Sequence, residues 1–298
     1  MNEANAPYPL HVKSALVCTD GSPASLGAVQ AGLSLSRATG CIIHLLEVVE
    51  FIPYYEYAQP EVLLIPPALG QEILKVQEAA VSQRLEAWKS QPEAQGVHLE
   101  THVRVGAGIF AEITAAVEEI KPDLVIMGRR GVSGLARLLL GSTTARVIGH
   151  SPVNVLVVPR DASLSYANLL VASDGSPFSA AAWEEALRLY QPQAGTLTAV
   201  VVAHGDLTAA LAADLLANLT NMAAARGVTL QTLSLAGRPY EAILKAAGQT
   251  GATLLILGSH GRTGLTRLLM GSVAERVIGQ APCPVLVVKR QETAAKPT

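Results

Sequence analysis

The stretch GRRGVSGLARLLLGSTTARVIGHSPVNVLVVPR at residues 128–160 returns as GSHGRTGLTRLLMGSVAERVIGQAPCPVLVVKR at residues 258–290, with 19 of 33 positions identical. A second matching pair lies upstream of these stretches: SALVCTDGSPAS at residues 14–25 and NLLVASDGSPFS at residues 168–179. Two matching stretches in the same order are the signature of a duplicated structural unit. The chain is therefore predicted to be a tandem repeat.

Each copy alternates short apolar runs, rich in β-branched residues, with longer stretches whose apolar residues recur at helical spacing. In the first copy the predicted strands are 15–18, 41–49, 97–105, 124–127 and 153–158, and the predicted helices are 23–39, 71–90, 109–120 and 143–150. Ser22 and Pro23 suit the cap and the first position of the first helix. Alternating strands and helices favour a parallel sheet covered on both faces. The sequence thus predicts an α/β chain of two tandem doubly wound domains, residues 1–160 and 161–298, with a linker at 159–168.

The first copy is longer than the second. Asp20 to Gly128 spans 108 positions, whereas Asp174 to Gly258 spans 84, so the first copy carries 24 extra residues. They are placed after the second predicted strand, near residues 51–74, where four prolines stand among clustered tyrosines. Prolines at that density exclude a continuous helix or a central strand. The segment is predicted to be a loop, which either folds over a binding site or is a surface excursion.

Two polar motifs in each copy follow predicted strands, at the edge where open parallel sheets bind their ligands. One is Asp-Gly-Ser, at 20–22 and 174–176; the other is Gly-x-x-Gly, nine residues, then Gly-Ser, at 128–142 and 258–272. Glycines let backbone N–H groups approach an anion, and a helix N-terminus favours phosphate. The aspartate either accepts sugar hydroxyls or closes a turn on nearby N–H groups. Each motif alone also fits a plain turn or cap, but their duplication favours a binding site.

With these motifs, both copies resemble universal stress protein domains of the subgroup that binds ATP, over residues 12–160 and 166–290. The resemblance implies, for each copy, a five-stranded parallel sheet of the Rossmann-like, adenine nucleotide alpha hydrolase-like type. It also implies that the last strands, 153–158 and 285–288, pair within one chain. By this resemblance, the aspartate of each copy would contact the ribose, and the valine 28 positions later would contact the adenine. The remaining residues of each set would hold the phosphates. The implied ATP site residues are Asp20, Val48, Gly128, Gly131, Gly141, Ser142 and Thr143, and then Asp174, Val202, Gly258, Gly261, Gly271, Ser272 and Val273.

The resemblance implies ATP, alone or with Mg²⁺, as the ligand of an intrachain pseudo-dimer, which itself either stays single or forms a homodimer. The first copy departs from the second at Arg129 and Arg130. Two guanidinium groups there either strengthen phosphate binding or face solvent. If Tyr54, Tyr55 and Tyr57 of the extra segment cover the base, the first site is expected to release nucleotide more slowly. If the segment occupies the cleft instead, only the second site holds nucleotide.

Composition bounds the remaining functions. The 298 residues are 50% hydrophobic and 15% charged, with a net charge of −2, so no basic field is available for nucleic acid. No membrane-length apolar run and no signal-like start occur, which predicts a soluble, cytoplasmic protein. Three cysteines lack metal-ligand spacing. The histidines at 44, 102, 150, 204 and 260 show no shared acidic partner, so no metal site is predicted.

Missing motifs argue against catalysis. The sequence has no Gly-x-x-x-x-Gly-Lys-Ser/Thr loop and no evident base, so no catalytic residue is assigned. The predicted function is that of an ATP-binding stress or regulatory protein, not an enzyme beyond slow ATP hydrolysis. Two alternatives stay open: an ATP-using enzyme of a related fold, which would need a further nucleophile or thiol motif, and an interaction scaffold that binds no nucleotide.

Overall fold

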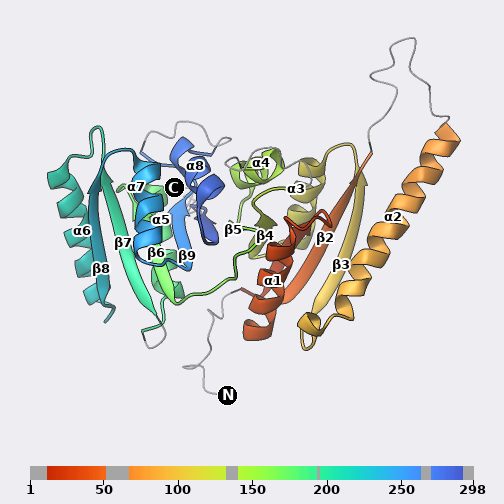
Figure 1. The fold of residues 1–298 in the computed structure, drawn as a ribbon, viewed down its shortest axis with the longest axis horizontal. Coiled ribbons are helices and arrows are strands. Elements are labelled where there is room, and N and C mark those ends of the chain that lie inside the picture. The colour runs from red at the N-terminus through yellow and green to blue at the C-terminus, as the bar shows by residue number, and fades with distance from the viewer. Residues whose placement is uncertain (1–11, 52–66, 132–139, 193–194, 263–269, 291–298) are drawn as a thin grey trace, which may run out of the picture.

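The computed structural model describes residues 12–51, 67–131, 140–192, 195–262 and 270–290 (Figure 1). Both halves repeat one order of elements. The first half holds β1 (Ser14–Thr19), α1 (Leu26–Thr39), β2 (Ile42–Glu50), α2 (Pro67–Lys89), the short 3₁₀ helix η2 (Pro92–Ala94), β3 (Leu99–Gly106), α3 (Ile109–Ile120), β4 (Leu124–Gly128), α4 (Ser142–His150) and β5 (Asn154–Val158). The second half holds β6 (Asn168–Ser173), α5 (Pro177–Leu189), β7 (Thr196–Ala203), α6 (Ala209–Ala224), β8 (Leu230–Ala236), α7 (Pro239–Gln249), β9 (Leu254–Gly258), α8 (Ser272–Gln280) and β10 (Val285–Val288).

The strands form one ten-stranded sheet in the order β3-β2-β1-β4-β5-β10-β9-β6-β7-β8. Within each half the strands are parallel, which confirms the predicted α/β fold of two doubly wound, five-stranded units. In the first half β1 lies between β2 and β4, and in the second β6 lies between β7 and β9. From β1 the chain continues to β2 on one side, whereas from β4 it continues to β5 on the other side, and β6 and β9 repeat this arrangement. Each half therefore has a topological switch point, where ligands of open α/β sheets bind.

The two halves join through their last strands. β5 pairs antiparallel with β10, with Val155 opposite Val287 and Leu156 opposite Leu286. The predicted pairing is confirmed. Each of these strands would otherwise be an exposed apolar sheet edge, which is a template for aggregation, and the pairing covers both. The sheet therefore continues from one half into the other.

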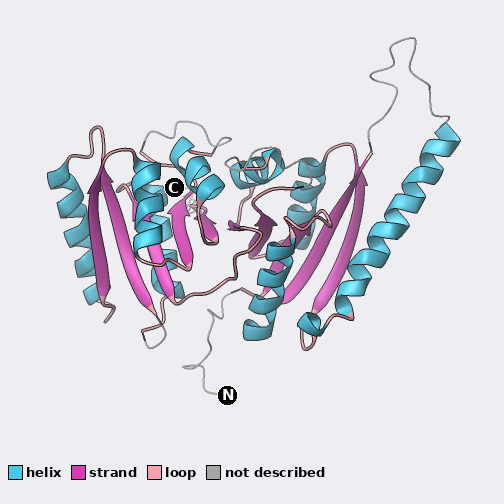
Figure 2. Ribbon diagram, in the orientation of Figure 1, coloured by secondary structure: helices cyan, strands magenta, loops and turns pink. Residues whose placement is uncertain are grey.

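Helices cover the sheet on both faces (Figure 2), which explains the nearly continuous apolar runs of its strands. Buried side chains of α1, α2, α5 and α6 pack against one face, and those of α3, α4, α7 and α8 against the other. Neighbouring strand residues divide accordingly: Ala15 and Val17 face the first core, Leu16 and Cys18 the second. Among the helices of the described ranges, none has the length and apolar character needed to cross a bilayer.

The first helix begins later than predicted. It starts at Leu26, not at Pro23. The reason is that the Ser22 N–H and hydroxyl both donate to Asp20 Oδ1, at 3.0 and 2.6 Å, so Ser22 is not a helix cap. In the second half the equivalent serine does cap its helix, because the Ser176 hydroxyl accepts the Ser179 N–H at the start of α5.

The extra residues of the first half do not all form a loop. Helix α2 has 23 residues where α6 has 16, so part of the extra length extends a helix that starts at Pro67, before the predicted residue 71. Proline is well tolerated at a first helical position. Residues 52–66, with the three tyrosines, lie outside the described residues, so both interpretations of that segment stay predictions.

Candidate functional site

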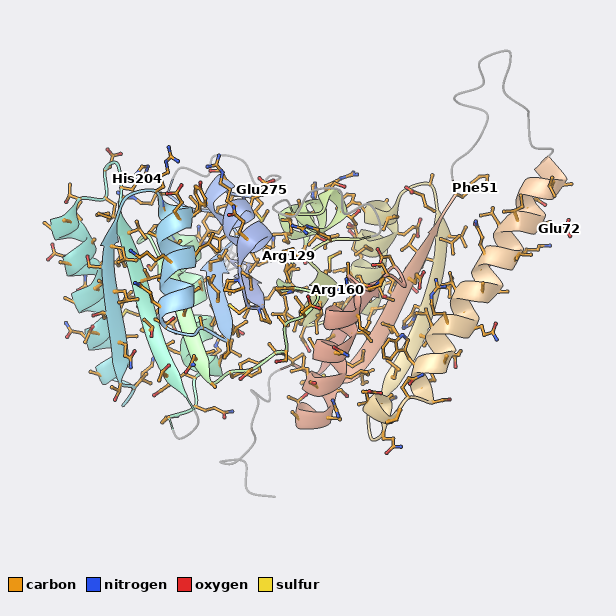
Figure 3. All side chains as sticks on the ribbon, viewed as in Figure 1. Phe51, Glu72, Arg129, Arg160, His204 and Glu275 are labelled. Atoms are coloured by element: carbon orange, nitrogen blue, oxygen red, sulfur yellow. The ribbon has the colours of Figure 1, made fainter. Side chains whose placement is uncertain are left out.

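A cavity of about 630 Å³ lies at the carboxyl edge of the second half, at the switch point between β6 and β9. Small-molecule sites commonly measure about 300–1,000 Å³. His204, labelled at this edge in Figure 3, is part of the lining. So are all seven residues that the sequence assigned to this copy's ligand: Asp174, Val202, Gly258, Gly261, Gly271, Ser272 and Val273. The structure thus brings together residues that span a hundred positions of the chain.

Asp174 ties the two polar motifs of this half to each other. Its Oδ1 accepts the Ser176 N–H at 3.0 Å, and its Oδ2 accepts the Arg262 N–H at 3.0 Å. A Cβ added at Gly261 would lie 2.7 Å from Oδ2, so a side chain at this position would displace the carboxylate. Asp174 therefore does close its turn. Because an ionised carboxylate has about four acceptor positions, it keeps capacity for ligand hydroxyls.

The glycine-rich end of the cavity is built around the start of α8. The Gly271 N–H donates to the Ser259 carbonyl at 3.0 Å, which fixes the turn before the helix. Helix α8 begins at Ser272, and its N-cap, Gly271, has no side chain to satisfy the first N–H groups. These N–H groups, the helix dipole and the Ser272 hydroxyl together favour an anion.

Apolar side chains line another part of the cavity. Val200, Val202, Leu207, Pro239 and Ile243 line it. The pairing of β6 with β7 ends at Val201, so Val202 has no partner residue on β6. An apolar wall beside this unpaired end of β7 suits the flat face of a heterocyclic base.

His260 is a lining residue to which the sequence gave no role. Its Nδ1 lies 3.1 Å from the Ser259 hydroxyl oxygen, and its ring packs against Phe178 with centroids 5.0 Å apart. The second ring nitrogen, Nε2, is buried and has no hydrogen-bond partner among the described residues. Since a buried polar atom is costly to leave unsatisfied, Nε2 is a natural contact for a ligand in this cavity.

The first half repeats the polar framework. A Cβ added at Gly131 would lie 2.6 Å from Asp20 Oδ2, which matches the close approach seen in the second half. The Thr144 hydroxyl donates to the Gly128 carbonyl at 3.0 Å, and Gly141 precedes α4 just as its counterpart precedes α8. The predicted residues Ser142 and Thr143 form the first turn of that helix, and Val48 lies one residue beyond the last β1–β2 pair.

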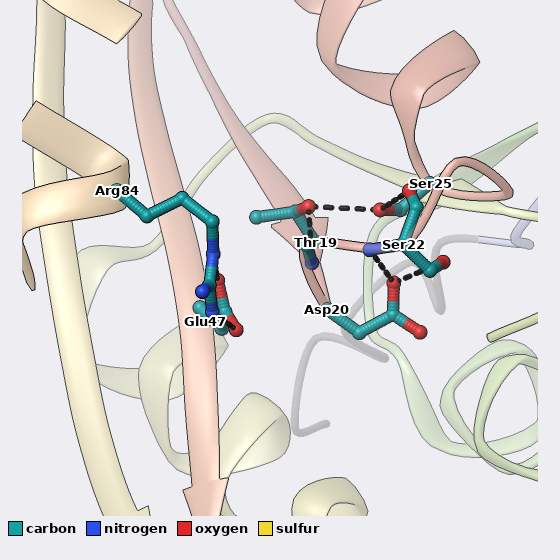
Figure 4. Close-up of polar contacts among 7 residues, drawn as sticks. Thr19, Asp20, Ser22, Ser25, Glu47 and Arg84 are labelled. Atoms are coloured by element: carbon teal, nitrogen blue, oxygen red, sulfur yellow. Dashed lines mark hydrogen bonds and ion pairs between the residues drawn. The ribbon is translucent and has the colours of Figure 1, made fainter. Parts of the chain in front are cut away.

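An ion pair beside the Asp20 turn distinguishes the first half. Glu47 of β2 is 5% exposed and pairs with Arg84 of α2, whose Nε lies 3.3 Å from Oε2 while Nη2 contacts Oε1 (Figure 4). The guanidinium packs on the Asp20 turn, because a Cβ on Gly21 would lie 2.7 Å from its Nε. Burial raises the pKa of Glu47, and Arg84 opposes this rise.

The second half has an apolar pair at the same place. The strand register makes Val201 the counterpart of Glu47, and Leu215 is the side chain nearest to a Cβ on Gly175. Sequence reasoning missed Glu47 and Arg84 because 37 positions separate them. The repeat itself held a signal, since Glu47 stands where the second half has Val201.

Replacing Arg84 by leucine is expected to destabilise the fold by about 1–3 kcal/mol, because Glu47 would stay buried without its partner. The expected loss of stability is smaller than for a fully buried pair, because the Arg84 side chain is 44% exposed. Urea unfolding at pH 7 measures the loss. The double variant Glu47→Val/Arg84→Leu copies the second half and should recover it.

The loss in the single variant should depend on pH. Without Arg84, burial holds the folded pKa of Glu47 above its ordinary value of 4.5. The folded state then binds the proton more tightly than the unfolded state, so stability falls as pH rises through this range. A single variant as stable as the parent at pH 7 would contradict the pairing.

Arg129 does not take either role weighed for it. Its Nη1 donates to the Ala281 carbonyl at 2.9 Å, at the end of α8, so the side chain links the two halves (Figure 3). Burial, and then the neighbouring Arg130, lower the pKa of Arg129. In the repeat, Arg130 stands at the position of His260.

Two of the histidines, His44 and His102, do share an acidic partner, Glu100, contrary to the sequence analysis. His44 Nδ1 lies 3.1 Å from His102 Nε2 and 3.2 Å from Glu100 Oε2. Burial lowers the pKa of His44, and Glu100 opposes this change. The β2–β3 register places Glu100 opposite His44, and no local spacing reports a contact between two strands so far apart in sequence.

The three cysteines are buried and free, which rules them out as ready nucleophiles. Burial raises the pKa of Cys18 to about 12 and that of Cys283 to about 11. Only the thiolate is nucleophilic, so these thiols are inert at neutral pH. Their predicted role as small core residues is confirmed.

Two doubly wound units with polar turns at their switch points define a class of α/β binding proteins. The sequence model of the universal stress protein family matches residues 11–159 and 165–289, nearly the whole chain. The chain belongs to the universal stress protein family.

Individual relatives agree with this assignment. A universal stress protein of Methanocaldococcus jannaschii is 33% identical over 152 residues, which are 50% of this chain and 82% of that protein. One of Mycobacterium bovis is 26% identical over 219 residues, covering 65% of this chain and 74% of its own length. The crystal structure of a universal stress protein from Archaeoglobus fulgidus has a TM-score of 0.71 at 24% identity, covering 94% of this chain and 99% of that one. At that identity the structural likeness shows the fold alone.

Proposed function

We propose that this universal stress protein binds ATP, alone or with Mg²⁺, at the carboxyl edge of each half, and that it has a nucleotide-dependent regulatory role. The observation that supports this most directly is the 630 Å³ cavity of the second half, which is lined by every residue assigned to that copy's ligand. A cytoplasmic location, where ATP is available, accompanies the proposal.

In the proposed complex each part of the nucleotide meets a matching surface. The base lies against the apolar wall at Val202 and Ile243. Ribose hydroxyls donate to Asp174, which still has acceptor capacity. The phosphates lie over Gly261 and at the start of α8, where N–H groups and a positive dipole end favour anions. A Mg²⁺ ion would arrive on the phosphates themselves, as it usually does.

Catalysis is not part of the proposal. The Asp174 carboxylate lies beside the glycine turn, and both its oxygens already accept backbone N–H groups. A base that activates water must reach the proton it removes and have a pKa suited to that task. ATP turnover is therefore expected far below the roughly 1–100 per second of kinases.

Two measurements test the proposal on the full chain. Nucleotide released by denaturing the purified protein is identified by mass spectrometry, and nucleotide-free protein is then titrated with ATP, with and without Mg²⁺. ATP should bind and GTP should bind less tightly, because the proposal assigns recognition of the adenine to Val202 at the end of β7. If no nucleotide is recovered and ATP does not bind, the interaction scaffold replaces this proposal. Turnover at kinase-like rates would favour the ATP-using enzyme.

His260→Ala is expected to weaken ATP binding at the second site by about tenfold, since a charge-assisted hydrogen bond contributes roughly 1.5–3 kcal/mol. The matched control is His260→Arg, which places the first half's residue type at this position and should bind at least as tightly as the parent. Calorimetric titration of both variants, with the first site disabled, measures the difference. Equal affinities for alanine and histidine would mean that Nε2 does not face the ligand.

A further inference from the structure

A cluster of metal-binding side chains lies in the first half, between β2 and the edge strand β3. The atoms that converge are His44 Nδ1, Glu100 Oε2 and His102 Nε2. His44 Nδ1 is 3.1 Å from His102 Nε2 and 3.2 Å from Glu100 Oε2, and the third separation is 4.0 Å. Ligand atoms held about 2.0–2.1 Å from a tetrahedral ion lie roughly 3.3–3.4 Å from one another. Two of the three separations are already close to this value, and the third, between His102 Nε2 and Glu100 Oε2, is longer at 4.0 Å.

We propose that His44, Glu100 and His102 form a binding site for a divalent transition-metal ion of the Zn²⁺ type. Two imidazoles with one carboxylate are a donor set that suits Zn²⁺ and its first-row neighbours, whereas Mg²⁺ and Ca²⁺ require oxygen ligands. An ion can reach the site, because the His102 and Glu100 side chains are 32% and 46% exposed. Three protein ligands leave a fourth position for water.

The second half shows that the fold does not need these residues. The strand register aligns His44 with Thr198, Glu100 with Gln231 and His102 with Leu233. Thr198 and Gln231 share a hydrogen bond of 3.4 Å, which performs the same cross-strand pairing without any imidazole. Because a threonine, a glutamine and a leucine suffice in an equivalent sheet, the donor set of the first half is a local addition.

A bound ion would fasten the edge strand to the sheet. His44 belongs to β2, and the other two ligands belong to β3, which is the terminal strand of the sheet that the described residues form. A metal that binds the folded state raises its stability by mass action. The ion would therefore stabilise β2. The same strand carries Glu47 and Val48 near its carboxyl end, where the proposed nucleotide site lies.

The test uses the full chain without a polyhistidine tag, stripped of metal by a chelator and titrated with Zn²⁺ in a calorimeter. One Zn²⁺ should bind per chain at this site, and excess Mg²⁺ should not displace it. His44→Thr and His102→Leu, which copy the second half, should each weaken this binding at least tenfold. Loss of even an outer partner of a zinc ligand costs roughly 10–100-fold. Zn²⁺ should also raise the melting temperature of the parent but not of these variants.

Two further variants keep the test decisive. Glu100→Gln changes an exposed residue, so it should fold normally and still bind Zn²⁺ more weakly than the parent. His150→Gln is the matched control, since Gln280 stands at that position in the second half, and its Zn²⁺ affinity should equal that of the parent. Affinities unchanged in all three cluster variants, or an equal loss in His150→Gln, would overturn the proposal.

Discussion

Gly261→Val should abolish most ATP binding at the second site while leaving the chain folded. A Cβ at this position would lie 2.7 Å from Asp174 Oδ2, so the carboxylate must leave its place beside the turn. That movement would break the hydrogen bond from the Arg262 N–H, and the valine methyl groups would occupy space next to the phosphates. A lost charge-assisted contact alone costs roughly 1.5–3 kcal/mol, so the affinity should fall at least about tenfold.

The corresponding change in the first half, Gly131→Val, should remove the other half of the bound nucleotide, because its Cβ would meet Asp20 Oδ2 at 2.6 Å. Gly248→Ala is the control: it lies in α7 with open space around an added Cβ, and it should bind as the parent does. Calorimetric stoichiometry decides the outcome. Two nucleotides per chain in the Gly131→Val/Gly261→Val double variant would refute the glycine-lined phosphate site.

Leu156→Pro is expected to destroy the junction between the halves. Leu156 is 2% exposed and lies in β5, between Ile126 of β4 and Leu286 of β10. Proline cannot donate to the strand ladder, and β5 has a neighbour on each side. Losing a buried leucine side chain adds about 2–5 kcal/mol. The sum is comparable with the roughly 5–15 kcal/mol that stabilises a typical protein.

The expected result for Leu156→Pro is therefore aggregation or a markedly lower melting temperature, read by size-exclusion chromatography and thermal unfolding. Leu156→Ile is its control, since it keeps the volume and the backbone donor, and it should cost less than about 1.5 kcal/mol. A soluble proline variant that melts with the parent would show that the β5–β10 pairing does not hold the halves together.

Local patterns predicted most of the fold. The repeat, the alternation of strands and helices and the Asp-Gly-Ser and glycine motifs are sequence-local signals, and they placed the switch points and the second-half cavity. What they could not predict depends on contacts between distant segments. The Glu47–Arg84 pair needs the packing of α2 on β2, the reach of Arg129 to Ala281 needs the junction, and the histidine cluster needs the β2–β3 register.

The prediction of where α1 begins was wrong for a different reason. The motif Asp-Gly-Ser-Pro is identical in both halves, yet Ser176 caps its helix while Ser22 bonds to Asp20. A serine hydroxyl has competing partners within a few residues, and small differences in the surrounding packing decide among them. The same four-residue sequence therefore adopts two different local structures.

The short connection at residues 159–167, between the end of β5 and the start of β6, changes how the junction responds to dilution. Two separate polypeptides joined by one strand pair would dissociate as their concentration fell, each exposing an unsatisfied strand. Here the second strand is tethered, so its effective concentration around the first is set by the tether and not by the amount of protein in the cell. The paired state persists however scarce the chain becomes.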